Sequence, residues 1–141
     1  EVEALNTEYQ RVGIDNIFLI SPTTPDARIA TITSAASGFI YYVAVKGVTG
    51  AGHLDSADVA DHVARIRATT ELPVAVGFGI KDAASARAIA ATADGVVVGS
   101  ALIDAMAKVQ STGADATAAC EAAINLLREI RTGVDSVASA A

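Results

Sequence analysis

The sequence predicts a parallel α/β sheet, in which strands and helices alternate along the chain. Three observations favour this fold: short apolar runs start near residues 17, 40, 74 and 95, segments with helical spacing separate them, and the runs are continuously apolar. Continuously apolar strands are typical of a parallel sheet that is covered on both faces. Because parallel strands need a crossover between them, all the strand C-termini are expected at one edge of the sheet.

The first strand is preceded by a helix and followed by another. EVEALNTEYQRVG, residues 1–13, has helical spacing and stops at Gly13, and NIFLIS, residues 16–21, has the length of a buried strand. TTPDARIATITSAASG then starts as a helix, with Thr24 as the expected N-cap and Pro25 at the first helical position.

The next two units repeat this order. FIYYVAV, residues 39–45, is expected to be a strand of aromatic and β-branched residues, and SADVADHVARIRATT, residues 56–70, is expected to be a helix. LPVAVGFGI, residues 72–80, is a strand entered through Pro73, which is tolerated at a strand start. KDAASARAIAATADG is the following helix.

The last unit completes about half of a known closed architecture. GVVVGSA, residues 95–101, is the fourth expected strand, and a long closing helix is expected from Gly113 to Arg131, interrupted at Thr132 and Gly133. Four βα units are half of a (β/α)₈ barrel, which needs about 250 residues. We therefore expect residues 1–141 to form a single domain that is either half a barrel or a four-stranded open sheet.

Composition and charge exclude several classes of protein. The chain is 52% apolar with a net charge of −6, so it can bury a core but offers no basic surface for nucleic acid or anionic lipid. No apolar run approaches the roughly 20 residues of a membrane span, and the acidic N-terminus is unlike a signal peptide. We expect a cytoplasmic protein, in which the lone Cys120 is buried in its helix.

Glycines gather where the expected strands end. Gly50, Gly77, Gly79 and Gly99 lie at or just after strand ends, and Ser100 adds a hydroxyl at the start of the following helix. Phosphate groups bind there through backbone N–H groups and helix N-termini, and a Cβ would block their approach. The alternative is that each glycine only makes a tight βα turn. The GFG segment lacks the third glycine of a dinucleotide fingerprint, so NAD binding is not expected.

Acid–base groups are missing from the same strand ends, which are occupied by Ser21, Lys46, Gly77 and Gly99. Asp26 and Asp82 stand at helix starts, where capping and the helix dipole explain them. His53 and His62 have no second histidine or cysteine at ligand spacing, so we expect neither a metal site nor a cofactor.

Three segments, in this order and at these separations, resemble the C-terminal half of the tryptophan synthase α subunit: NIFLISPTTPDARIATITSAASGFIYYVAVKGVTGAG, LPVAVGFGIKD and ADGVVVGSAL. The resemblance covers nearly the whole chain. It implies a TIM barrel whose fifth to eighth strands are the four described above. It also implies a lyase of tryptophan biosynthesis that cleaves indole-3-glycerol phosphate to indole and glyceraldehyde 3-phosphate, and that passes indole to a β subunit within an α2β2 complex.

The same resemblance assigns site residues. It implies that Thr49 lies on a loop that closes over the substrate, and that Leu19 and Tyr41 line the pocket, although Tyr41, like Phe39 and Tyr42, is alternatively a core aromatic. The family's acid–base pair, a glutamate and an aspartate, belongs to its second strand and the following loop, so no catalytic residue is expected in this chain. The implied phosphate ligands are Gly50, Gly77, Phe78, Gly79, Gly99 and Ser100.

Two other functions remain open from the sequence. One is a non-catalytic half-barrel that binds phosphorylated ligands and pairs with itself through exposed strand edges. The other is an aldolase in which Lys46 forms a Schiff base with a carbonyl substrate. A catalytic lysine needs burial or a nearby cation to lower its pKa, whereas Lys46 adjoins a glycine-rich loop that is expected to be solvated.

Overall fold

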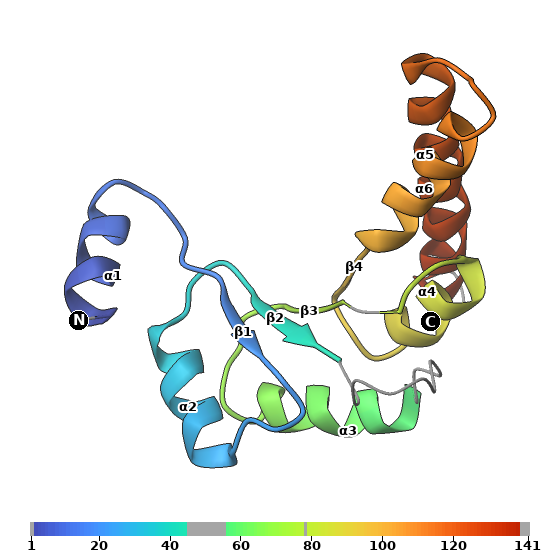
Figure 1. The fold of residues 1–141 in the computed structure, drawn as a ribbon. Helices are drawn as coiled ribbons and strands as arrows, with labels where there is room; N and C mark the ends of the chain where they lie inside the picture. The colour runs from blue at the N-terminus through green and yellow to red at the C-terminus, as the bar shows by residue number, and fades with distance from the viewer. Residues whose placement is uncertain (1, 45–55, 78, 139–141) are drawn as a thin grey trace.

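The computed structural model describes residues 2–44, 56–77 and 79–138, and the described residues form four parallel strands with helices before, between and after them (Figure 1). The helices are α1 (Val2–Arg11), α2 (Asp26–Ala35), α3 (Ser56–Arg67), α4 (Ala83–Ala90), α5 (Ser100–Gln110) and α6 (Ala116–Ala138). The strands are β1 (Phe18–Ile20), β2 (Ile40–Val43), β3 (Val74–Gly77) and β4 (Gly95–Val97). The predicted element order is confirmed.

The strands pair in sequence order, β1-β2-β3-β4, and each pair is parallel. Leu19 of β1 pairs with Tyr41 of β2, and Gly77 of β3 pairs with both Val43 of β2 and Val97 of β4. All the C-terminal strand ends therefore lie at one edge of the sheet, as the apolar runs predicted.

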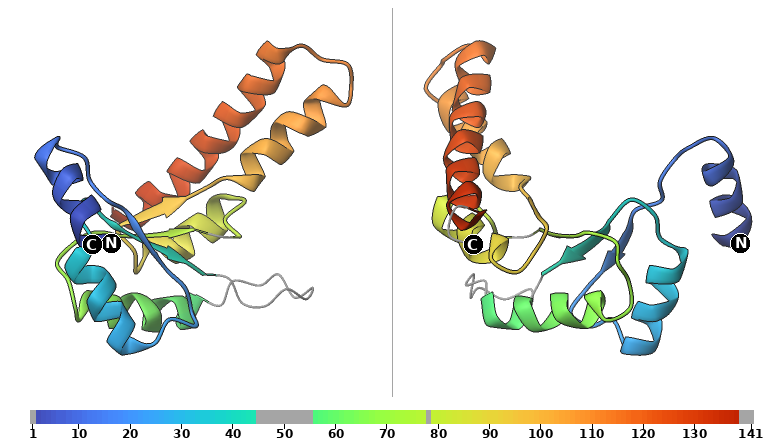
Figure 2. Two further views of the ribbon diagram at one scale, coloured as in Figure 1. Left: turned by 60° about the vertical axis from the view of Figure 1, so that its left-hand side comes forward. Right: turned by 180° about the vertical axis from the view of Figure 1, so that it is seen from behind.

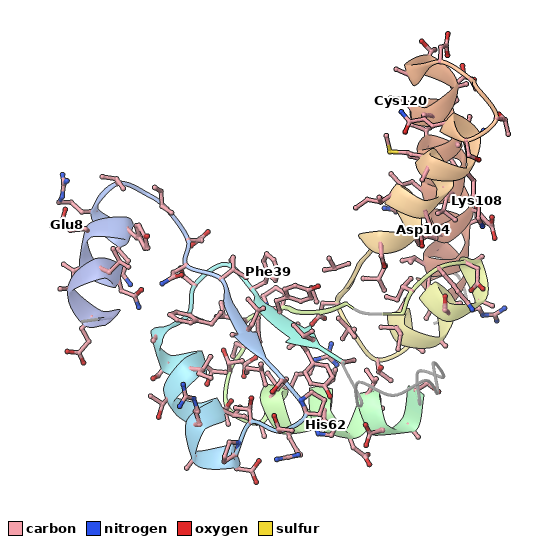
Figure 3. All side chains as sticks on the ribbon, viewed as in Figure 1. Glu8, Phe39, His62, Asp104, Lys108 and Cys120 are labelled. Carbon is pink, nitrogen blue, oxygen red and sulfur yellow. The ribbon has the colours of Figure 1, made fainter. Side chains whose placement is uncertain are left out.

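Helices α2 and α3 cover one face of the sheet (Figure 2). Alternate strand residues are buried on this face, where they join side chains of α2 and α3 in the core: Ile20, Ile40, Tyr42, Val74, Val76, Ile29, Val63 and Ile66. Figure 3 shows Phe39 and His62 on opposite sides of β2. On the face away from α2 and α3, Leu19 is 58% exposed, so the expectation of two covered faces is met on one face only in the described part of the chain.

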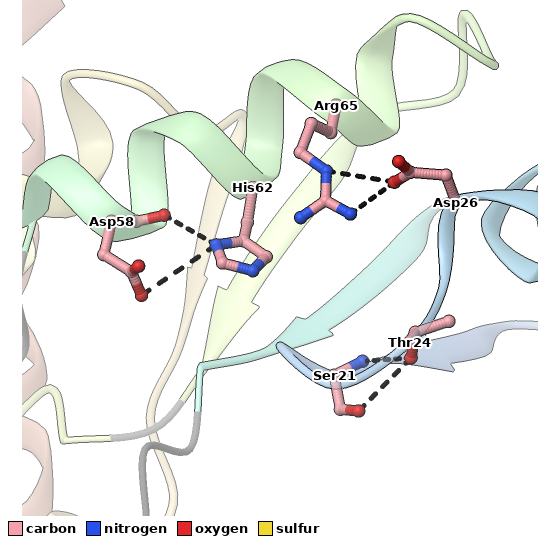
Figure 4. A network of polar contacts seen from close by, with 6 residues as sticks. All are labelled: Ser21, Thr24, Asp26, Asp58, His62 and Arg65. Atoms are coloured by element: carbon pink, nitrogen blue, oxygen red, sulfur yellow. Dashed lines mark hydrogen bonds and ion pairs between the residues drawn. The ribbon is translucent and has the colours of Figure 1, made fainter.

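An aromatic stack joins β2 to α3. The Tyr42 and His62 rings lie 5.4 Å apart at 16°, and His62 Nδ1 lies 2.8 Å from the Asp58 carbonyl oxygen (Figure 4). Burial, and to a lesser extent the Asp58 carboxylate, raises the pKa of Tyr42 to about 12. Tyr42 is fully buried and is therefore part of the core, as the sequence suggested.

The start of α2 differs from the prediction. Pro25, not Thr24, is the N-cap residue, and its carbonyl accepts hydrogen bonds from the N–H groups of Arg28 and Ile29 at 2.9 and 3.0 Å. The Thr24 hydroxyl instead accepts a hydrogen bond from the Ser21 N–H at 3.1 Å (Figure 4). The predicted Thr24 cap is wrong because the turn after β1 already uses this hydroxyl.

Helix α6 also differs from the prediction, because it continues through Thr132 and Gly133 without interruption. Gly133 is buried, and a Cβ built on it would meet the backbone of Ala83 at the start of α4, with the Ala83 Cα only 2.9 Å away. This glycine lets two helices approach closely and does not end a helix.

The single cysteine lies in an unexpected environment. Cys120 is a free, exposed residue of α6, near the outer end of the α5 and α6 pair (Figure 3). Its neighbour Ala119 is buried, so the adjacent position faces away from the packed side of the helix. The predicted burial of Cys120 is therefore wrong.

A carboxylate at the N-terminal end of β4 ties three elements together. Asp94 accepts a hydrogen bond from the Val74 N–H of β3 at 2.8 Å and pairs with Arg67 of α3 at 2.8 Å. The Val74 N–H, followed by Arg67, lowers the pKa of Asp94 below its ordinary value. Asp94 therefore stabilises the fold at pH values above that ordinary value, and the contribution is lost as the pH falls through the lowered pKa.

We expect Asp94→Asn to reduce the free energy of unfolding by about 1 kcal/mol at pH 7, a small value because solvent screens this half-exposed pair. The difference between the variant and the parent chain should shrink as the pH falls below the ordinary aspartate pKa and through the lowered pKa of Asp94, where the folded parent carboxylate becomes protonated. Urea unfolding across this range measures both effects. Asp104→Asn, at an exposed position of α5, is the control, and an equal loss in both variants would contradict the role of Asp94.

Candidate functional site

The ends of β3 and β4 bring two of the predicted glycines together. Gly77, the last residue of β3, pairs with Val97, the last residue of β4. Gly79 and Gly99 each come two residues after one member of this pair, so they follow the ends of adjacent strands. Both glycines are exposed. Gly79 has a φ of 75°, a left-handed conformation that side chains with a Cβ rarely adopt. The backbone is therefore accessible at two neighbouring strand ends.

The N-terminus of α5 lies at the same edge. Gly99 is its N-cap residue and supplies no side-chain cap, while its carbonyl accepts the Leu102 N–H at 3.0 Å. Among the described residues, no atom outside Gly99 and its two chain neighbours lies within 4 Å of the position that a Cβ on Gly99 would take, and Ser100 is exposed. The first N–H groups of a helix have no partner within the helix and carry its positive dipole end, so this terminus suits an anion.

The N-terminus of α4, in contrast, is already closed by a side chain. Asp82 accepts the Ser85 N–H at 2.8 Å, and the Asp82 N–H donates to the Ser85 hydroxyl at 3.2 Å, which forms a capping box. The Ser85 backbone hydrogen bond lowers the pKa of Asp82, so the cap is negatively charged at neutral pH. The prediction that Asp82 is a cap is confirmed. The adjacent α5 terminus is therefore the better of the two for an anion.

Leu19, Tyr41 and Gly77 lie on the uncovered face of the sheet. A Cβ built on Gly77 would lie 2.6 Å from Tyr41 Cε2 and 2.8 Å from Tyr41 Cζ. The absence of a side chain at Gly77 therefore leaves room for the Tyr41 ring. This packing role is separate from the predicted role of Gly77 in binding an anion. Sequence reasoning missed this contact, because it depends on the strand register that sets Tyr41 beside Ala75, two residues before Gly77.

The remaining predicted residues lie outside the described part of the chain. They are Lys46, Thr49, Gly50, His53 and Phe78. Their roles in phosphate binding, loop closure or Schiff-base chemistry therefore stay predictions.

Within the described residues, no group of three or more histidine, cysteine, aspartate or glutamate residues is placed to hold a metal ion. No helix among the described residues is both long enough and apolar enough to cross a membrane. A shallow pocket lies between α2 and α3, but its Arg65 already pairs with Asp26 (Figure 4). This pocket is on the helical side of the sheet, away from the uncovered face.

The chain is similar to known proteins over nearly its whole length. The family model described as tryptophan synthase alpha chain matches residues 1–133. The tryptophan synthase alpha chain of Bordetella parapertussis is 48% identical over 97% of this chain, and that of Burkholderia multivorans is 43% identical over all of it. The match covers 49% of the first relative and 50% of the second, so the chain spans about half the length of the curated relatives it matches.

Solved structures agree with this assignment. The crystal structure of tryptophan synthase subunit alpha from Legionella pneumophila is 31% identical in sequence and has a TM-score of 0.78. The match covers 96% of this chain and 48% of the Legionella chain. A crystal structure of tryptophan synthase from M. tuberculosis in an aminoacrylate-bound form is 28% identical in sequence and has a TM-score of 0.74. The match covers 95% of this chain and 46% of the M. tuberculosis chain. These neighbours are TIM barrels, and the predicted fold class is confirmed. The chain belongs to the tryptophan synthase alpha chain family.

Proposed function

We propose that this chain is the phosphate-binding half of a tryptophan synthase α subunit, which cleaves indole-3-glycerol phosphate to indole and glyceraldehyde 3-phosphate. Family membership supports the reaction, and the edge of the sheet supports the role of this half. The observation that carries the proposal is the uncapped start of α5 beside the exposed, left-handed Gly79. Backbone N–H groups at these two places would hold the phosphate, with the hydroxyl of Ser100 nearby.

The uncovered face of the sheet would hold the rest of the substrate. Leu19 is exposed on this face, and Tyr41 lies beside it in the strand register. The half-buried Tyr41 ring, held against Gly77, would form one wall for the glycerol and indole groups. In this proposal Gly50, Phe78 and Thr49 complete the phosphate site and its closure, as the family resemblance implies.

The proposal extends to the surroundings of the chain. Residues 1–141 act as one domain, and together with the other half of the barrel they bind a tryptophan synthase β subunit in the cytoplasm. The α reaction requires no cofactor in this scheme, because it depends on proton transfers and on phosphate binding. The free Cys120 supports a reducing compartment.

Replacement of Gly79 by valine tests the phosphate site. A β-branched residue cannot adopt a φ of 75° without strain, so the β3–α4 turn must move its N–H groups. We expect Gly79→Val to weaken binding of inorganic phosphate and of glycerol phosphate at least tenfold, as measured by titration calorimetry.

The matched control is Gly113→Val. Gly113 has a φ of 82° and lies in the turn between α5 and α6, so the substitution introduces similar backbone strain far from the sheet edge. Phosphate affinity should be unchanged in this control. Equal affinities for the parent chain and Gly79→Val would place the phosphate elsewhere.

A further inference from the structure

Ser85, in the first turn of α4, makes one hydrogen bond more than helix capping requires. In a capping box the third helical side chain accepts the N–H of the N-cap residue, and the Ser85 hydroxyl accepts the Asp82 N–H in this way at 3.2 Å. The same hydroxyl also accepts the N–H of Lys81, which precedes the helix, at 3.1 Å. This additional bond reaches into the turn that joins β3 to α4.

All three hydrogen-bonding positions of the Ser85 hydroxyl are used. A serine hydroxyl has one donor and two acceptor positions, and the acceptor positions hold the N–H groups of Lys81 and Asp82. The donor faces the Asp82 carboxylate, whose Oδ1 lies 2.7 Å from Ser85 Oγ. The Ser85 N–H donates to this same oxygen at 2.8 Å. The hydroxyl therefore fixes the end of the turn relative to the first turn of α4.

Gly79 lies between this end of the turn and two other fixed points. Gly77 pairs with β4 at the end of β3, and Ile80, which directly follows Gly79, is buried in the core. The next two N–H groups are those held by Ser85. Glycine has access to more backbone conformations than other residues, so Gly79 does not by itself select its φ of 75°. The fixed points on either side select it.

We propose that Ser85 is a positioning residue of the phosphate site, whose hydroxyl keeps the β3–α4 turn in the conformation that presents the Gly79 backbone to the phosphate. This inference rests on the proposed phosphate site and adds to it a side chain that does not touch the ligand. Without the hydroxyl, two N–H groups of the turn lose their acceptor, and the turn samples other conformations. If about one fifth of the molecules then keep the binding conformation, the dissociation constant rises about fivefold.

Titration calorimetry of the 141-residue chain with inorganic phosphate provides the test. We expect Ser85→Ala to weaken binding about fivefold. Ser85→Thr keeps a hydroxyl with the same donor and acceptor positions, so its affinity should stay within about twofold of that of the parent chain. Circular dichroism checks that each variant keeps its helices. Equal affinities in all three chains, or an equal loss in both variants, would overturn the proposal.

Asp115→Ala is the matched control for the loss of a helix cap. The Asp115 carboxylate accepts the Ala118 N–H at 2.9 Å at the start of α6, in the same turn as Gly113 and away from the end of the sheet. This variant should lower the urea midpoint of unfolding about as much as Ser85→Ala does, while its phosphate affinity stays unchanged. A loss of phosphate affinity in Asp115→Ala would show that caps act on binding only through overall stability.

Asp82→Asn separates the charge of the capping box from its geometry. Asparagine is also a good N-cap, and its side-chain oxygen can accept the same bonds from Ser85. The variant removes a negative charge beside the proposed phosphate site, so it should bind phosphate at least as tightly as the parent chain. A loss as large as that in Ser85→Ala would attribute the effect to the carboxylate charge and exclude positioning by the hydroxyl.

Gly79→Val distinguishes failure of this inference from failure of the proposed site. If Gly79→Val loses phosphate affinity while Ser85→Ala binds as the parent chain does, the site is correct and the positioning role of Ser85 is wrong. If Gly79→Val also binds as the parent chain does, the phosphate lies elsewhere and both proposals are wrong.

Discussion

The 141-residue chain, purified alone, is expected to bind glycerol phosphate but to release indole from indole-3-glycerol phosphate at least 10⁴-fold more slowly than a complete α subunit. Cleavage requires protonation of an indole carbon and removal of a proton from a glycerol hydroxyl. Each positioned acid or base typically contributes about 10² to 10⁴ in rate. The expected loss corresponds to the absence of two such groups.

The described strand ends show why turnover should fail. They carry Ser21 after β1, Gly77 at the end of β3 and Gly99 after β4, and no carboxylate among the described residues occupies these positions. Asp82 follows the end of β3 by a few residues, but its carboxylate caps the N-terminus of α4. Hydrogen bonds from Ser85 lower the pKa of this carboxylate. A carboxylate with a lowered pKa is a poor proton donor at neutral pH.

Addition of the other half of a full-length relative, such as the Burkholderia multivorans alpha chain, should restore indole release. The restored activity should disappear again in Gly79→Val, because that variant loses the phosphate, and persist in Gly113→Val. This pair of variants separates failure of the phosphate site from failure of the halves to combine. Turnover by the chain alone at a rate near that of a complete α subunit would mean that the catalytic groups have been misplaced.

The sequence was sufficient to predict the order of the elements. Each strand lies within a short apolar run bounded by glycine, proline or polar residues, and segments with helical spacing separate these runs, so local pattern and tertiary structure agree. The capping role of Asp82 was also predictable, because Ser85 stands three residues later. Local signals of this kind depend on neighbours within one helical turn.

The wrong predictions concern residues whose partners lie elsewhere in the fold or in an adjoining turn. Thr24 has the composition of an N-cap, yet its hydroxyl binds Ser21. The contact between Tyr41 and Gly77 joins two residues that are 36 positions apart and depends on the register of β2 and β3. The exposure of Cys120 depends on which side of α6 packs against α4 and α5. The spacing of residues along the chain does not predict any of these contacts. It does not predict the contact between Gly133 and Ala83 either.

Gly133 is the position where a small substitution should have a large effect on stability. Replacement of an exposed glycine by alanine within a helix normally stabilises a protein by about 1 kcal/mol, because alanine has the higher helix propensity. At Gly133 the sign should reverse, because the new Cβ would meet the Ala83 backbone, which cannot rotate away as a side chain can.

We expect Gly133→Ala to reduce the free energy of unfolding by about 2 kcal/mol, and Gly133→Val by 3 kcal/mol or more. The measurement is urea unfolding followed by circular dichroism. The control is Thr132→Ala, at the exposed neighbouring position of α6, which should change stability by less than about 0.5 kcal/mol.

The loss should come from the contact between α6 and α4, and therefore from the support that α4 gives to the β3–α4 turn. In Gly133→Val, hydrogen exchange of the amides of α4 and of the second half of α6 should accelerate more than that of α2, which packs against α3 and β1. If Gly133→Ala instead stabilises the chain, as it would in an isolated helix, α6 does not pack against Ala83 and the position of the closing helix must be revised.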